Sequence, residues 1–255
     1  MLMSKWKQKY PLFFTSFIII FSTSMYLSSC SKITTIRLNW RTHSRNAYVI
    51  STNKSATRYR ETKGILEEFG FTVIHIQPKY VGDTMRQQTF SNKLALLNAV
   101  EQIKRGKDPW GYVFEDDITL NEHSNASIRD IIRSERNTKH FQYLGVCLPQ
   151  GQEIKRTSCG RCAHAMGFSK QGANELLEFS EIRSAVKPRD RGETIIPAQE
   201  PYLDVIVDHW CQHSGGFTIT GPLIKSAKSV VEGHIGIFIQ DRGKFQSVIS
   251  NARQE

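Results

Sequence analysis

Short apolar runs alternate with helically spaced apolar positions in the first part of the chain. Ala47 to Ile50 is a run of β-forming residues, and the residues after it place apolar side chains on one helical face. Ser55 is positioned to cap this helix and Gly70 to end it. Phe71 to Ile76 is the next run of β-formers. The pattern therefore predicts a strand, a helix and a second strand, in that order.

A second helical pattern leads into the most informative boundary of the sequence. Leucine, valine and isoleucine recur at helical spacing from about Ser91 until Gly106, with Leu94 on the inward face. Trp110 to Phe114 is a third candidate strand, and it runs directly into the three acids Glu115 to Asp117. The acids are therefore expected at the end of a buried strand.

The remaining pattern continues the alternation of strands and helices. Phe141 to Val146 and Ala163 to Phe168 are candidate strands, and Pro201 opens a helix that carries Asp204 and Asp208 on one face. Such alternation predicts an α/β fold with a mostly parallel, doubly wound sheet flanked by helices. In folds of this kind, ligands bind at the carboxyl ends of the strands.

The N-terminal region follows a different pattern. Pro11 to Leu27 is an uncharged, mainly apolar run, and it reaches about the shortest length that spans a bilayer once Ser28 to Cys30 are added. A basic start before a short apolar run fits a signal-anchor and a cleaved signal peptide alike. The segment Leu27 to Cys30 also resembles a bacterial lipoprotein cleavage box. Each of the three alternatives would export the domain that follows.

The preferred organisation is a single-pass type II protein with one globular domain. Residues 1–10 form a cytosolic tail, 11–30 the signal-anchor and 31–45 a short basic stem, and the α/β domain occupies 46–255. A length of 255 residues allows one well-buried domain but is short for two once the N-terminal segment is set aside. We expect this domain to face the lumen of the Golgi or the endoplasmic reticulum.

The charge and the cysteines narrow the possible partners. A formal charge of +10 indicates attraction to anions. No basic recognition helix, zinc-finger spacing or RNP-like aromatic motif accompanies it, which argues against nucleic-acid binding. Cys159 and Cys162 suggest zinc or redox chemistry, but no second ligand pair at zinc spacing follows. A structural disulfide is the preferred interpretation for an exported domain, with the pairing among Cys147, Cys159, Cys162 and Cys211 left open.

The acids Glu115, Asp116 and Asp117 are the leading candidates for chemistry. Carboxylate oxygens at the lip of a sheet are hard ligands suited to Mg²⁺ or Mn²⁺, and such an ion neutralises charge on a departing diphosphate. Because a strand alternates its faces, two of the three acids are more plausible ligands than all three. The alternative is a solvated acidic loop.

With these motifs in view, the sequence resembles the lipopolysaccharide and procollagen galactosyltransferase family, glycosyltransferase family 25, and the wider set of GT-A glycosyltransferases. The resemblance covers roughly residues 46–179, with a looser tail to about residue 249. It rests on Tyr48 to Ser51 with Arg58, on Tyr112 to Asp117, and on Cys162 to Ser169 leading into Gly172-Ala173. It departs from the family in the first loop, which reads Ser51 to Lys54, and in the segment Phe90 to Leu94.

The resemblance implies a GT-A-like fold and a transferase that uses a nucleotide-diphosphate sugar as donor. The first loop would lie near the nucleotide, which makes Ser51, Thr52 and Arg58 candidate donor-binding residues. Asp116 and Asp117 would hold Mn²⁺, or Mg²⁺, on the diphosphate, with Asp116 also close to the donor.

Two late residues are further candidates. Glycines around His234 would let the backbone approach a ligand closely. The resemblance implies a late histidine as the third metal ligand, and we assign that role to His234. Arg242 could bind phosphate with two hydrogen bonds, although a surface ion pair with Asp241 is the simpler account. His164, inside a candidate strand, is either a site residue or a satisfied core group.

Asp204 is the candidate catalytic base. An inverting transferase needs a carboxylate to take the proton from the acceptor hydroxyl. Asp204 and Asp208 are four residues apart on one helix, so both could face one cleft, and a solvated helix face is the alternative. Glu200, near the start of the helix, could serve as a cap or as a partner of the helix dipole.

The sequence thus predicts a metal-dependent hexosyltransferase that acts on a hydroxyl of a glycan or a protein. A non-catalytic lumenal glycan-binding or assembly protein with the same fold is the alternative, motivated by the altered first loop and Lys93. A metal-dependent phosphohydrolase would need further carboxylates or histidines in motif spacing, and the sequence does not supply them convincingly.

Overall fold

The computed structural model describes residues 45–54, 56–79, 84–147, 159–187, 193–214, 217–219 and 234–240. The apolar N-terminal run, Ser55 and Arg242 lie outside these ranges. None of the helices within them combines the length and apolar character needed to cross a bilayer.

A mixed sheet forms the centre of the described structure, with strands in the order β2-β1-β3-β6-β5-β7 and with β8 paired to β5. The strands are β1 (Arg45–Ile50), β2 (Phe71–Ile76), β3 (Trp110–Glu115), β5 (Phe141–Cys147), β6 (Arg161–Ser169), β7 (Phe217–Ile219) and β8 (His234–Gly236). β1, β2 and β3 are parallel to one another.

The expectation of a mostly parallel sheet is wrong for the second half. β6 runs antiparallel to β3 and to β5, and β8 runs antiparallel to β5, whereas β7 is parallel to β5. An apolar run of β-formers specifies a strand but not its direction. The α/β class, with helices on both sides of a sheet, is confirmed.

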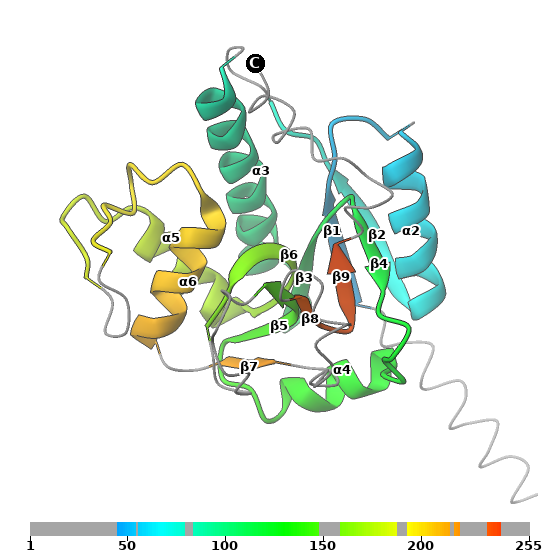
Figure 1. Ribbon diagram of the computed structural model, residues 1–255. Coiled ribbons are helices and arrows are strands. Elements are labelled where there is room, and N and C mark those ends of the chain that lie inside the picture. The colour runs from blue at the N-terminus through cyan, green and yellow to red at the C-terminus, as the bar shows by residue number, and fades with distance from the viewer. Residues whose placement is uncertain are drawn as a thin grey trace, which may run out of the picture. The chain divides into compact units, whose positions relative to one another are not determined.

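Helices cover both faces of the sheet (Figure 1). On one face, α3 (Met85–Arg105), α5 (Lys170–Ser180) and α6 (Leu203–Ser214) share a core with strand residues such as Tyr48 and Val113. On the other face, α2 (Thr57–Phe69) and α4 (Ile128–Glu135) share a second core with the alternate residues Val49 and Phe114. Successive side chains of β1 and β3 therefore point to opposite faces of the sheet and contribute to two separate cores.

Local capping sets the limits of several helices. Gly70 ends α2 in the left-handed conformation, with φ at 112°, as the sequence predicts. α3 begins at Met85, six residues before the expected start, because Thr84 and Gln87 form a capping box there. Ser169 caps α5 by accepting a hydrogen bond from the backbone N–H of Gly172.

A small second sheet lies next to the end of β3. β4 (Ile118–Leu120) pairs antiparallel with β9 (Phe238–Gln240), so that Ile118 is opposite Gln240. This pairing brings a residue from late in the chain beside the acids that end β3. His164 is fully buried and its Nε2 lies 3.2 Å from the carbonyl oxygen of Phe238, which supports the core interpretation of this histidine.

β5 and β8 approach each other very closely at two glycines. Gly145 pairs with Gly236, whose φ is 133°, where the chain leaves β8 for β9. A β-carbon at Gly145 would collide with the carbonyl of Phe238 and the ring of His164. Glycine is therefore required there by space, and at Gly236 also by conformation.

Candidate active site

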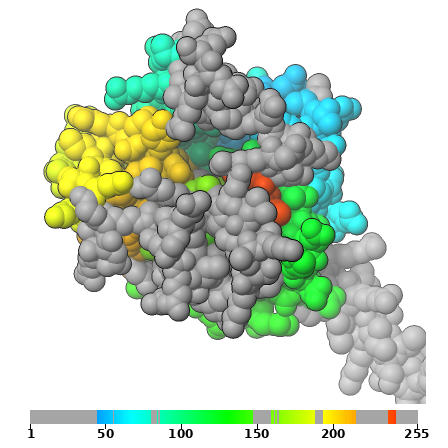
Figure 2. All heavy atoms as spheres, viewed as in Figure 1, coloured from blue at the N-terminus to red at the C-terminus, as the bar shows by residue number. Residues whose placement is uncertain are grey.

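A cavity of about 470 Å³ opens at the carboxyl ends of β1 and β3, next to the first turns of α2 and α6. Figure 2 shows the surface hollowed between the yellow atoms of α6 and the cyan atoms of α2. The polar and charged side chains that line it include Ser51, Thr52, Arg58, Lys93, Glu115, Asp116, Asp117, Asp204 and Gln240. Seven of the residues selected from the sequence, namely Ser51, Thr52, Arg58, Glu115, Asp116, Asp117 and Asp204, thus meet in one cavity, although they come from four segments of the chain.

Ser51 fixes one side of the acid cluster. It directly follows β1, its backbone N–H donates to the carbonyl of Ile76, and its own carbonyl lies 2.8 Å from Nε2 of His75. The Ser51 hydroxyl donates to Oδ2 of Asp116 over 2.6 Å. The buried end of β1 therefore holds the carboxylate of Asp116 in a defined orientation.

Arg58 bridges the two aspartates. Its Nη2 atom lies 2.8 Å from Oδ1 of Asp116 and 3.2 Å from Oδ2 of Asp117. One nitrogen atom thus touches an oxygen of each carboxylate, so the two oxygens converge on a single point. That geometry, and the hard oxygen donors, fit the requirements of a divalent cation.

Burial disfavours the ionised forms of two of these acids, Glu115 and Asp117. Burial, and after it the charges of Asp117, Asp204 and Asp116, raise the pKa of Glu115 to about 8, against the opposing effect of the hydrogen bond from Gln240. Burial also raises the pKa of Asp117, and Arg58 opposes this rise. Nε2 of Gln240 donates to Glu115 over 2.6 Å and lies 3.5 Å from Oδ1 of Asp117. A cation at this point would relieve the repulsion among the acids.

Asp204 lines the cavity from the first turn of α6, and its Oδ2 lies 3.4 Å from the backbone nitrogen of Cys162. Asp208 does not join it, contrary to the expectation that both could face one cleft. Asp208 is fully buried and accepts a hydrogen bond from Gln212 over 3.0 Å. The buried face of α6 is wider than the predicted stripe and includes this residue.

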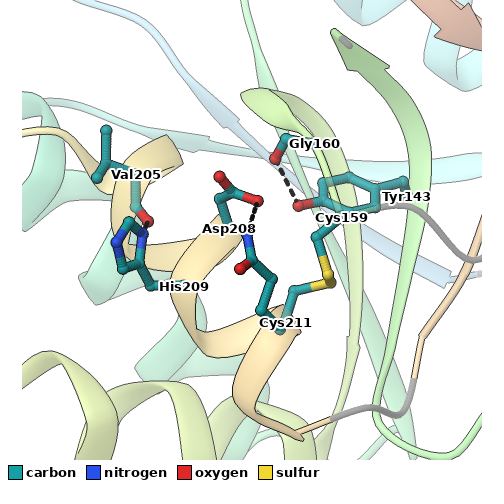
Figure 3. Close-up of a disulfide and its surroundings, with 8 residues drawn as sticks. Tyr143, Cys159, Gly160, Val205, Asp208, His209 and Cys211 are labelled. Carbon is teal, nitrogen blue, oxygen red and sulfur yellow. Dashed lines mark hydrogen bonds between the residues drawn. A yellow bond between two sulfur atoms is a disulfide. The ribbon is translucent and has the colours of Figure 1, made fainter. Parts of the chain in front are cut away.

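A disulfide ties α6 to the segment before β6. Cys159 bonds to Cys211 near the end of α6, and Figure 3 shows this bond beside Tyr143, whose hydroxyl donates to the carbonyl of Gly160. Cys162 is disulfide-bonded as well. The expected structural disulfide is thus confirmed for Cys159, and the zinc interpretation of Cys159 and Cys162 is wrong.

Lys93 is a cavity residue that the sequence did not assign to a site. It is only 3% exposed, and its Nζ donates to the carbonyl oxygens of Glu200 (2.7 Å) and Pro197 (3.1 Å). Burial lowers its pKa. The sequence did contain a sign that Lys93 is buried. Thr89, Lys93, Leu96 and Val100 recur at helical spacing, as do the residues of the expected stripe through Leu94, and they form the buried face. Leu94 is instead 46% exposed.

The side chains of two other candidates, His234 and Arg242, are not among those that the structure describes. The backbone of His234 belongs to β8 and pairs with Cys147, but its side chain lies outside the described part of the structure. Arg242 lies outside it entirely. Within the described ranges, no group of three or more His, Cys, Asp or Glu side chains is arranged to hold a metal ion. Glu200 accepts a hydrogen bond from the backbone N–H of Tyr202, the residue before the first residue of α6.

Comparison with known proteins adds little at the level of sequence. No protein-family model matches the chain, and no curated protein matches it. Among solved structures, a glycosyltransferase involved in the glycosylation of the major capsid of PBCV-1 is 10% identical, with a TM-score of 0.47 over 83% of this chain and 98% of that one.

A second solved structure is similar over a shorter part of the chain. A putative glucose-1-phosphate thymidylyltransferase from Bacillus anthracis, in complex with sucrose, is 15% identical, with a TM-score of 0.33 over 68% of this chain and 65% of that one. At these identities and scores, neither likeness assigns a function to the chain or places it in glycosyltransferase family 25.

Proposed function

We propose that this protein is a glycosyltransferase that moves a hexose from a nucleotide-diphosphate sugar to a hydroxyl of a glycan or protein acceptor, with a divalent metal ion. The observation that carries the proposal is the convergence of Asp116 and Asp117 on one point, in a cavity that also holds a separate carboxylate, Asp204. Transfer from a diphosphate donor needs these two things: a charge-neutralising centre for the leaving group and a base for the acceptor.

Mn²⁺ or Mg²⁺ is the proposed cofactor, with Asp116 and Asp117 as ligands and His234 as a further ligand. When bound, the ion would neutralise charge on the departing diphosphate. Ser51 and Thr52 line the donor end of the cavity, and Arg58 and Arg242 are the proposed phosphate-binding arginines. The volume of about 470 Å³ falls in the range of small-molecule sites.

Asp204 is the proposed base. Its carboxylate would take the proton of the acceptor hydroxyl while the oxygen attacks the anomeric carbon and the nucleoside diphosphate departs. Its place in the same cavity as the acids, but on α6 rather than on the sheet, supports this division of roles.

The setting of the enzyme is part of the same proposal. We infer a signal-anchor at residues 11–30 and a lumenal domain in the Golgi or endoplasmic reticulum. The disulfide between Cys159 and Cys211 supports an oxidising compartment, because such bonds rarely persist in a reducing cytosol.

The test is to incubate the purified full-length protein with a panel of nucleotide sugars and to measure the nucleoside diphosphate released. We expect turnover of at least one donor, its loss on chelation and its recovery on adding Mn²⁺. A protein that binds glycans but turns over no donor would instead be the non-catalytic glycan-binding alternative.

A further inference from the structure

Arg58 already places a positive charge where a metal ion is expected. Its Nη2 contacts both Asp116 and Asp117, and its side chain keeps 21% exposure at the wall of the cavity. The other oxygens of the two carboxylates face further donors, the Ser51 hydroxyl on Asp116 and the Gln240 amide near Asp117. The pair of carboxylates is therefore engaged by the protein's own donors.

Two cations do not share such a point. Charges of the same sign about 3 Å apart repel strongly, even in a medium of moderate dielectric. An ion that uses Oδ1 of Asp116 and Oδ2 of Asp117 takes the same two oxygens that Arg58 uses. The guanidinium must leave when the ion binds.

We propose that Arg58 is a resident cation that a divalent ion displaces, and that the displaced guanidinium then binds the donor diphosphate. The first half of this inference depends only on the carboxylate pair, and the second half rests on the proposed function. Arg58 stays within the cavity wall after it leaves the acids, because its backbone is fixed in the first turn of α2. Its planar fork suits two-point contact with phosphate oxygens.

Lys93 does not fit this exchange. Its Nζ is already directed at two backbone carbonyls, those of Pro197 and Glu200, and it contacts neither aspartate in the described structure. The side chain of Lys93 is also far less exposed than that of Arg58. Of the two basic side chains that the described residues bring to the cavity, Arg58 is therefore the one suited to the exchange.

Calorimetric titration of Mn²⁺ into the metal-free full-length protein tests the exchange without any turnover. In Arg58→Gln the competitor is gone, so we expect Mn²⁺ to bind roughly tenfold more tightly or better, the scale of hydrogen bonds to a charged group. Arg60→Gln removes the same charge from an exposed position of the same helix and should change the affinity by about twofold at most. Arg58→Lys retains the charge but not the fork, and should fall between.

The second half is tested with inorganic pyrophosphate at saturating Mn²⁺. We expect Arg58→Gln to bind pyrophosphate roughly tenfold more weakly, and Arg60→Gln to match the wild type. Thermal unfolding shows whether each variant is folded. If Arg58→Gln is not folded, the same measurements are made on Arg58→Lys.

Three results would overturn the exchange. One is a Mn²⁺ affinity that does not rise in Arg58→Gln, and another is a rise of equal size in Arg60→Gln. The third is pyrophosphate binding that needs Arg58 but no metal, which would make the arginine a permanent substitute. A protein that shows the exchange yet turns over no nucleotide sugar would reject the proposed function and leave the exchange standing.

Discussion

The two halves of the sheet supply the cavity in different ways. In the parallel half, β1 and β3 are buried on both faces and carry Ser51 and the three acids directly at their ends. In the antiparallel half, none of the described strand ends supplies an acid to the cavity. Asp204 instead comes from α6, which is joined to the segment before β6 by the bond between Cys159 and Cys211.

The difference separates two kinds of positioning. The acids are held by the burial of Val113 and Phe114 next to them, since both residues are inaccessible to solvent. Asp204 lies on a helix that a disulfide joins to the segment before β6, and its carboxylate contacts the backbone of Cys162 over 3.4 Å. Substitutions in the parallel half should therefore change the binding of the metal ion and the donor. Substitutions in α6 or in its disulfide should instead change the step in which the acceptor is deprotonated.

The sharpest test of the parallel half is Asp117→Asn, which keeps the shape of the side chain and removes its charge. Loss of an ion contact in a partly desolvated site should lower the rate of transfer about a hundredfold or more, and weaken the dependence on Mn²⁺. Asp108→Asn, at the opposite end of β3, is the control and should leave the rate unchanged. Wild-type rates and Mn²⁺ dependence in Asp117→Asn would show that the acids form a loop without a metal role.

The matching test of the other half is Asp204→Asn. Without the base, transfer should fall roughly a hundredfold, while Mn²⁺ affinity measured by calorimetry stays within about twofold of the wild type. Asp208→Asn, one turn further along α6, should keep the rate per folded molecule because Asp208 is not in the cavity. If Asp204→Asn instead weakens Mn²⁺ binding, the two halves do not have separate roles.

Removing the covalent link should loosen only the second half. Replacing both Cys159 and Cys211 by serine opens a cross-link that spans 52 positions of the sequence, and should lower the free energy of unfolding by about 2–4 kcal/mol. Denaturant unfolding measures this loss. Turnover should fall while Mn²⁺ affinity is kept, and equal losses of both would argue against independent positioning.

The smallest expected effect concerns Glu115 and pH. Its pKa is raised from 4.5 to about 8 in the folded protein, so the folded state binds this proton more tightly than the unfolded state. Its contribution to the free energy of unfolding is complete below about pH 4.5 and is lost as the pH rises through about 8. We therefore compare the melting temperatures of Glu115→Gln and the wild type without metal. The melting temperature of the variant relative to that of the wild type should rise by a few degrees as the pH is raised from about 5 to about 9. A constant difference across this range would contradict the shifted pKa.

The sequence was most informative where structure is local. β1, β2 and β3 follow from their apolar runs, and Gly70 and Gly106 mark the ends of α2 and α3 as expected. The direction of β6 and the pairing of β4 with β9 could not be predicted, since both depend on contacts between residues far apart in the chain.

The same limit applies to the site. Arg58, Asp116 and Asp204 could each be selected from their own motif or helix, but the bridge from Arg58 to both aspartates is a tertiary contact. Lys93 was not assigned to the site, because a lysine on a helix is normally solvent-exposed and its two carbonyl partners come from a loop about a hundred residues away.

Because of the close approach at Gly145, the protein should be sensitive to substitution at this position. The residue has no functional group and does not line the cavity, yet a single added methyl would push against the Phe238 carbonyl at the start of β9. That strand carries Gln240 to the acids, so the disturbance would be passed along three residues into the site. A missense change from glycine to alanine at this position would thus be recorded as a loss of activity in a protein whose cavity residues are all intact.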